Sequence, residues 1–274
     1  MRQRAWDWSW RLEAAGLVLW LGAGAAGWTQ EPASAGAAFD KYVGTLESRL
    51  AEERQSEDTS LGGVDRERVR TGQVLIEKLT PAKDADPPGG MLHHWRGTAF
   101  APGATAADFE RVIRDFDDYP NVYAPQVVRA RLVSHDGDHD AVTMRVKQKH
   151  VITVVMDTSY DVMFGRLNER DGYSVSRSTR IDEIEAADTA KERVLTAKEK
   201  HGFLWRLNTY WNYVERDGGL YLQIESVSLT RSIPQGLGWA VRPFVESVPK
   251  ESLEFTLRQT CGALKHDPEE KGAP

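Results

Sequence analysis

Charged side chains embedded in β-rich segments are the candidates for acid–base chemistry in this sequence. Arg177 and Arg180 lie in segment 173–184, and Glu225 lies in segment 220–230. A carboxylate can move a proton, and an arginine can stabilise a developing negative charge. Because successive strand residues point to opposite faces, we expect Arg177 and Arg180 on opposite faces, one of them directed inward.

Common enzyme motifs are missing from the sequence. It contains no His-Glu-x-x-His, no phosphate-binding Gly-x-x-x-x-Gly-Lys and no Gly-x-Ser-x-Gly. His93 and His94 are adjacent on an expected strand, so they cannot hold one metal together. Segment 136–147 contains calcium-loop aspartates, but Ala141 and Lys147 stand where an EF-hand needs Gly and Glu. We expect a solvated hairpin tip there, and neither a metal nor a cofactor.

The single cysteine and a basic strand have structural interpretations. Cys261 excludes an internal disulfide, and its place on an apolar helical stripe predicts core packing. Arg145, Lys147 and Lys149 alternate and therefore share one strand face. That face would suit transient contact with anionic lipid headgroups, but the net negative charge favours a polar outer face.

The overall composition predicts a globular protein with a substantial core. The chain has 274 residues, of which 41% are hydrophobic and 28% charged. Its 35 basic and 41 acidic residues give a net charge of −6, which argues against nucleic-acid binding.

The first 35 residues have the pattern of an export signal. Arg2, Arg4 and Arg11 precede the apolar, glycine-containing stretch 14–28, and residues 33–35 read Ala-Ser-Ala. We expect cleavage near Ala35 and export, and the lack of disulfides favours a bacterial periplasm. An uncleaved N-terminal membrane anchor is the alternative.

Three segments have helical patterns. The first is 38–56, followed by a polar linker to residue 70. The second is 105–116, where Thr105 and Asp108 have the spacing of a capping box. The third runs to about residue 264; we expect Pro243 to interrupt it and Ser247 to cap a cleaner second half.

Strand patterns fill most of the remaining chain. Three Asp-Gly pairs, which suit hairpin turns, separate several β-rich runs and predict an antiparallel sheet. The expected strands are 73–79, 91–100, 127–133, 141–155, 158–167, 173–184, 203–214 and 220–230.

Two passages resemble a known superfamily. Residues 96–104 (RGTAFAPGA), with the helix that follows, look like its first strand and helix. Residues 116–125 (FDDYPNVYAP) are similar to its aspartate–tyrosine–proline passage. The superfamily is the START-like, SRPBCC or helix-grip group, which includes lipid-transfer START domains, coenzyme-Q-binding proteins and polyketide cyclases.

The resemblance implies an α+β fold in which a curved antiparallel sheet wraps around a long C-terminal helix. We expect a signal peptide at 1–35, a helical extension and linker at 36–70, the START-like domain at 71–264 and a polar tail at 265–274. Aromatic and polar strand residues are candidates to line an apolar cavity. They are Tyr160, Arg177, Arg180, Trp205, Trp211, Tyr213, Glu225, Trp239 and Phe244.

Three functions follow as hypotheses. The first is an exported carrier of a hydrophobic small molecule such as a lipid, quinone or isoprenoid. The second is a cyclase/dehydrase-like enzyme, with Glu225 or a tyrosine as acid–base and Arg177 or Arg180 stabilising charge. The third is an envelope interaction protein that docks or dimerises through helix 38–56. The sequence leaves the oligomeric state open.

Overall fold

The computed structural model describes residues 30–265 except 56–64, 81–85, 150–152 and 234–237, and only the backbone of 238–246. The predicted leader lies outside the described residues, apart from 30–35, and so does most of the polar tail. Among the described helices, none is long and apolar enough to cross a membrane.

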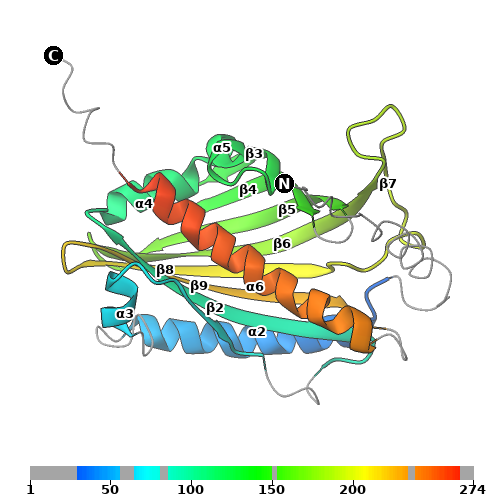
Figure 1. Ribbon diagram of the computed structural model, residues 1–274, viewed down its shortest axis with the longest axis horizontal. Helices are drawn as coiled ribbons and strands as arrows, with labels where there is room; N and C mark the ends of the chain where they lie inside the picture. Colours follow the sequence, from blue (N-terminus) through cyan, green and yellow to red (C-terminus); the bar gives the residue numbers. More distant parts are fainter. Residues whose placement is uncertain (1–29, 56–64, 81–85, 150–152, 234–237, 266–274) are drawn as a thin grey trace, which may run out of the picture.

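The centre of the molecule is one antiparallel sheet (Figure 1). Its strand order is β1-β2-β9-β8-β6-β5-β4-β3, and the short β7 pairs with β6. The antiparallel sheet predicted from the hairpin signals is therefore confirmed. The bounds are β1 Leu75–Lys78, β2 Gly90–Pro102, β3 Val127–Asp136, β4 His139–Lys149, β5 Thr153–Arg166, β6 Asp171–Glu185, β7 Arg193–Val194, β8 Arg206–Arg216 and β9 Gly219–Arg231.

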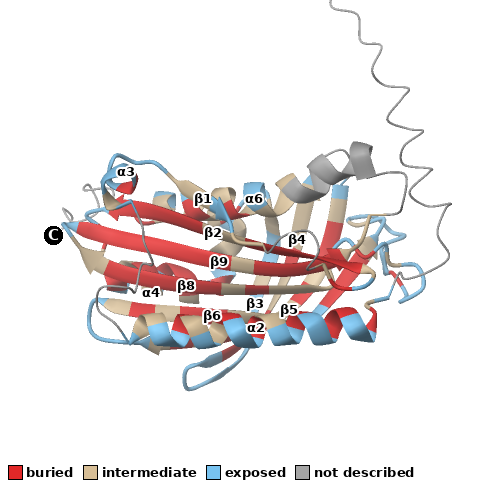
Figure 2. Ribbon diagram, turned by 90° about the horizontal axis from the view of Figure 1, so that it is seen from below, coloured by how far each residue is buried: buried red, intermediate tan, exposed pale blue. Residues whose placement is uncertain are grey.

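Helices cover both faces of this sheet (Figures 1 and 2). The C-terminal helix α6, Gly238–Ala263, crosses the face that we call inner. The N-terminal helix α2, Ala33–Arg54, lies along the opposite, outer face. Its apolar side chains pack against outer-face residues such as Val227 and Leu229. The sheet is thus the middle of three layers.

The sheet curls around α6, because strands far apart in it both reach this helix. On β2, a Cβ at Gly97 would clash with Leu257, so glycine allows the helix to approach closely. On β4, Gln148 donates a hydrogen bond of 3.0 Å to Ser252 of α6. Four strands separate β2 from β4 in the sheet. The predicted curved sheet around a C-terminal helix is confirmed.

The expected interruption of this helix by Pro243 is wrong. The α6 backbone is helical without a break from Gly238 to Ala263, through both Pro243 and Pro249. A proline removes one backbone hydrogen bond without always ending a helix. The long apolar contact of α6, which includes Leu253 and Leu257 in the core, stabilises the continuous helix.

Helix α4, Ala106–Arg114, covers one end of the inner face. The predicted capping box is confirmed, with the Thr105 side chain accepting from the Asp108 N–H and Asp108 accepting from the Thr105 N–H. Phe109 directs its ring at Trp211 and Tyr213, with centroids 5.3 and 5.0 Å away. The turns η2, Phe116–Asp118, and α5, Tyr119–Val122, follow it and lead into β3.

Two of the three Asp-Gly turns are confirmed. Those at 136–137 and 217–218 join β3 to β4 and β8 to β9. The third is wrong, because Asp171 and Gly172 already pair with β8. Asn168 forms that turn instead by accepting the N–H groups of Arg170 and Asp171. The expectation of one strand over 141–155 is wrong, because this run contains most of β4 and the start of β5.

The segment between α2 and β1 contains more structure than a linker. Helix α3, Arg66–Arg70, is capped at its N-terminus by Asp65, whose side chain accepts a hydrogen bond from the Arg68 N–H. Val69 is fully buried and packs with Phe100 and Tyr221 on the outer face.

Candidate functional site

A β-bulge in β6 places Arg177 and Arg180 on the same face. Arg177 pairs with Asp161 and Arg180 with Ser159, two residues apart on β5, and the register shifts between them. Strand neighbours two apart share a face. Both arginines therefore lie on the outer face, and the expectation that one of them faces inward is wrong. Arg177 pairs with Glu47 of α2, and Arg180 is exposed beside Asp182.

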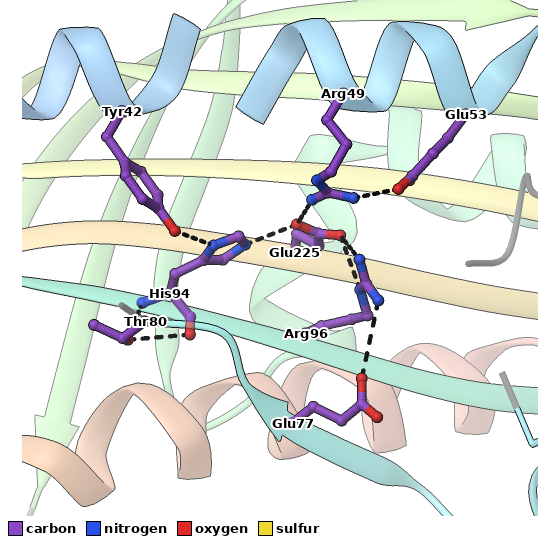
Figure 3. A network of polar contacts seen from close by, with 8 residues as sticks. All are labelled: Tyr42, Arg49, Glu53, Glu77, Thr80, His94, Arg96 and Glu225. Atoms are coloured by element: carbon purple, nitrogen blue, oxygen red, sulfur yellow. Dashed lines mark hydrogen bonds and ion pairs between the residues drawn. The ribbon is translucent and has the colours of Figure 1, made fainter. Parts of the chain in front are cut away.

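Glu225 also lies on the outer face, beneath α2 (Figure 3). It is fully buried, and three cationic or imidazole groups surround its carboxylate. His94 Nε2 lies 2.7 Å from Oε2, Arg49 Nη2 lies 2.6 Å from the same oxygen, and Arg96 Nη2 lies 2.8 Å from Oε1. Arg49 comes from α2, whereas His94 and Arg96 come from β2, so this carboxylate joins two layers.

These partners keep Glu225 ionised. Burial opposes ionisation, but the His94 hydrogen bond and the positive charges of Arg96 and Arg49 outweigh it and lower the pKa of Glu225 to about 2. A group that exchanges protons at neutral pH needs a pKa near 7. Glu225 is also inaccessible to a substrate. The geometry gives it a positioning role and does not support the expected acid–base role.

Tyr42, His94 and Glu225 form a hydroxyl–imidazole–carboxylate series (Figure 3). The Tyr42 hydroxyl lies 2.8 Å from His94 Nδ1, and the other ring nitrogen faces Glu225. Burial and the charge of Glu225 raise the pKa of Tyr42, which disfavours its reactive anion. His93 points to the inner face and bonds Thr230, so the predicted separation of the two histidines is confirmed.

A second group of polar contacts holds the same helix. Glu47 of α2 accepts from Arg177 at 2.8 Å and from the Tyr210 hydroxyl at 3.0 Å. Arg54 donates to Asn212 at 3.0 Å. These contacts were not predicted from the sequence. The sequence signal for them is the alternation of Asn208, Tyr210 and Asn212 on β8, which places polar groups on one face of the strand. Polar groups on a covered face need hydrogen-bond partners from the element that packs on it.

The inner face holds three of the predicted cavity residues. Tyr160, Trp211 and Tyr213 belong to the core cluster on the α6 side. Burial raises the pKa of Tyr160 to about 12. The Tyr213 hydroxyl donates to Glu110 of α4 at 2.6 Å, and its pKa is raised by burial and by that carboxylate. The structure therefore brings these aromatic residues together on the inner face, and their role in ligand binding stays a prediction.

Away from α4, the inner face is partly accessible to solvent. Its half-buried residues combine apolar surfaces with small hydroxyl groups. On β6, inner-facing Ser174 is buried and Ser176 and Ser178 are half-buried, so this central strand presents no bulky side chain to the interior there. Other half-buried residues on this face include Trp95, Met144, Val146, Leu207 and Thr209.

Trp205 lies elsewhere, at the N-terminal end of α2. It packs with the outer cluster and lines a cavity of about 600 Å³ together with Pro32 and Ile181. Arg206 and Glu31 form an ion pair of 2.9 Å at the same place. Trp239 and Phe244 lie on the backbone of α6, and their side chains are outside the described residues.

The remaining candidates have local partners. Arg145 pairs with Asp157 and Glu192, and Lys147 lies 3.8 Å from Asp188, so the basic strand faces acidic groups. Burial raises the pKa of Cys261 to about 11, which keeps the thiol protonated. Within the described part of the chain, no three His, Cys, Asp or Glu residues are placed to hold a metal.

Comparison with known proteins found similarity among solved structures. No family model matches, and no curated protein matches. A STAR-related lipid transfer protein from Xanthomonas axonopodis has 16% identity and a TM-score of 0.44, covering 70% of this chain and 99% of that one. Zhui aromatase/cyclase from Streptomyces sp. R1128 has 13% identity, a TM-score of 0.44 and coverages of 62% and 92%. Human STARD10 has 10% identity, a TM-score of 0.44 and coverages of 76% and 82%.

The fold assignment follows from the sheet order and from the contact of α6 with both β2 and β4. The chain has a helix-grip architecture. Helix α2 covers the outer face of this sheet through an apolar cluster and through ion pairs to Glu225 and Arg177. The candidate binding surface is the inner face under α6, and Glu225, Arg177 and Arg180 are not part of it.

Proposed function

We propose that this helix-grip domain binds a hydrophobic small molecule, such as a lipid, quinone or isoprenoid, between the inner face of the sheet and α6. The observation that carries the proposal is the half-buried inner face away from α4. It offers apolar and aromatic surfaces with a few hydroxyl groups, the composition of small-molecule sites.

The strand order supports the same location. The sheet must curl for β2 and β4 both to reach α6, and the central strands β5, β6 and β8 then form the floor beneath the helix. The small serine side chains of β6 leave space between this part of the sheet and the helix. Transfer of an apolar ligand from water to this surface stabilises the complex by about 25 cal/mol per Å² of apolar surface buried.

Binding is favoured over acid–base catalysis because of where the ionisable groups lie. The proposed proton-transfer residue Glu225 is buried on the other face with a pKa of about 2. Arg177 and Arg180 lie on that outer face as well. The interaction hypothesis loses its main feature too, because Phe39, Val43, Leu46 and Leu50 of α2 are buried against the chain's own sheet.

We further propose that the protein is exported, with transient membrane contact for loading or release of its ligand. The basic start and the apolar stretch 14–28 support export. A folded domain that covers an apolar ligand allows its movement through an aqueous compartment. Fractionation of the native host tests this location independently of ligand binding.

The decisive experiment is native mass spectrometry with solvent extraction of the protein purified from its native host. We expect a bound hydrophobic molecule in the wild type and its loss in Ser176→Trp, which fills the floor of the site. Thr179→Trp, on the exposed part of the same strand, is the matched control and should retain the ligand. An empty wild type that also takes up no added lipid or quinone would overturn the proposal.

A further inference from the structure

Trp95 carries a buried hydrogen-bond donor on the inner face. Its indole Nε1 is shielded from solvent, and no acceptor lies within hydrogen-bond distance in the described part of the chain. Trp95 shares its face of β2 with Gly97, which touches Leu253 and Leu257 of α6. The ring packs against the same core cluster as those two leucines. The donor is therefore in the layer between the sheet and α6.

An unpaired buried N–H is unfavourable, because the group has lost its water without gaining a protein acceptor. Phenylalanine would provide an aromatic surface without that cost. Lys78 Nζ lies 5.8 Å from the centroid of the Trp95 ring, a contact that favours an aromatic residue here. The buried N–H itself gains a partner only if an acceptor enters this layer in some state of the protein. The proposed ligand occupies the same layer.

We propose that the ligand is an apolar molecule with an uncharged oxygen acceptor, a carbonyl or ester group, which accepts the hydrogen bond from Trp95 Nε1. This inference rests on the proposed function and specifies the ligand's chemistry. Hydroxyl groups of Ser176, Ser178 and Thr209 lie on the same face and can bond other oxygen atoms. Arg177, Arg180 and Glu225 lie on the opposite face and cannot pair with a charged group there. The cation nearest Trp95 that the structure places on this face, Lys78, is exposed at the edge of the sheet, away from the buried N–H.

Trp205 provides an internal control. Its Nε1 is also buried, and no acceptor for it lies in the described part of the chain. Trp205 belongs to the outer cluster under α2, on the other side of the sheet. Removal of this donor should leave inner-face binding unchanged, while its cost to folding should resemble that of the Trp95 substitution.

The test compares 2-tridecanone with tridecane, which differ in one carbonyl oxygen. Displacement of the neutral fluorescent probe N-phenyl-1-naphthylamine from the full chain measures both affinities. In the wild type we expect tighter binding of the ketone. Trp95→Phe should weaken ketone binding about tenfold and leave alkane binding within about twofold. Trp205→Phe should leave both affinities unchanged.

A second measurement remains informative if Trp95→Phe folds poorly. In wild-type protein labelled with ¹⁵N-tryptophan, one indole N–H resonance should shift on addition of the ketone and not of the alkane. Spin-labelled ketone should broaden the same resonance. If the probe and both ligands bind but Trp95→Phe keeps the ketone preference, the Trp95 assignment is wrong while the binding function stands. If neither probe nor ligand binds, both proposals are overturned.

Discussion

Arg49 and Glu225 are 176 residues apart in the chain, yet their side chains meet at 2.6 Å. This ion pair joins α2 to β9 across the outer face of the sheet. Glu225 is fully buried, so its charge depends on Arg49, Arg96 and His94. The outer layer is thus fixed by a desolvated polar group as well as by apolar packing, and this arrangement has measurable consequences.

Removal of the central charge should weaken the fold strongly. Glu225→Gln leaves Arg49, Arg96 and His94 without their shared carboxylate, and loss of one partner in a buried ion pair costs about 3–5 kcal/mol. Urea unfolding followed by circular dichroism measures this loss. Glu77→Gln is the control, since Glu77 is largely exposed and 4.0 Å from Arg96; we expect a change of at most about 0.5 kcal/mol. Equal effects of the two substitutions would contradict the central role of Glu225.

The same carboxylate predicts an acid-dependent loss of stability. The pKa of Glu225 is about 2 in the folded protein, below the ordinary glutamate value of about 4.3. Its contribution is therefore complete above about pH 4.3 and is lost as pH falls towards 2. The difference in unfolding free energy between wild type and Glu225→Gln should be constant from pH 6 to 5 and shrink below pH 4. A difference independent of pH down to 2.5 would show that the native carboxylate pKa is not lowered.

The N-terminal boundary of the folded domain should lie before Gly36. The expected cleavage position follows Ala35, which is fully buried in the first turn of α2. A chain starting at Gly36 loses that contact, the buried Pro32 and the Glu31–Arg206 ion pair. We expect it to be about 2 kcal/mol less stable than a chain starting at Gln30. Urea unfolding of both chains checks this expectation, and N-terminal sequencing of exported protein locates the native start. Equal unfolding midpoints would mean that residues 30–35 do not stabilise the domain.

The loop before β8, which includes residues 201–203, should become less stable as pH rises. Glu183 is buried and accepts His201 Nδ1 at 2.8 Å and the N–H groups of His201, Gly202 and Phe203. The hydrogen bond with Glu183 raises the pKa of His201; burial and Arg231 oppose this shift, and Glu185 assists it.

A raised histidine pKa stabilises the folded state below the unfolded value of about 6.5, and the effect is lost as pH rises through the folded pKa. An NMR titration should place the His201 pKa above 6.5, and Glu183→Gln should bring it down. The loop amides should exchange faster at pH 8.5 than at pH 6 after correction for intrinsic rates. A His201 pKa of 6.5 or lower in the wild type would refute this interpretation.

Local patterns in the sequence were sufficient for most of the elements and for their order. The Thr105–Asp108 capping box, the α2 and α4 helices and two Asp-Gly hairpins depend on contacts within a few residues, and all are present. Trp211 and Tyr213, which alternation places on one face of their strand, lie together in the core on the α6 side, and their role in ligand binding stays a prediction. Such features follow from helical and strand periodicity, which the chain carries locally.

The sheet face on which an individual charged side chain lies could not be predicted in this way. Alternation shows that two strand residues share a face, but not which face is inside. A bulge between Arg177 and Arg180 then reversed their expected relationship, because one extra residue moves the following side chains to the other face.

The sequence by itself determined a curved antiparallel sheet, a C-terminal helix on one face of it and an amphipathic helix that precedes the sheet in the chain. Only the tertiary structure decided that the early helix covers the outer face and that Glu225 is a buried anion there. The reason is that a carboxylate's burial and pKa depend on Arg49, His94 and Arg96, which folding brings from distant positions. No local pattern encodes that meeting.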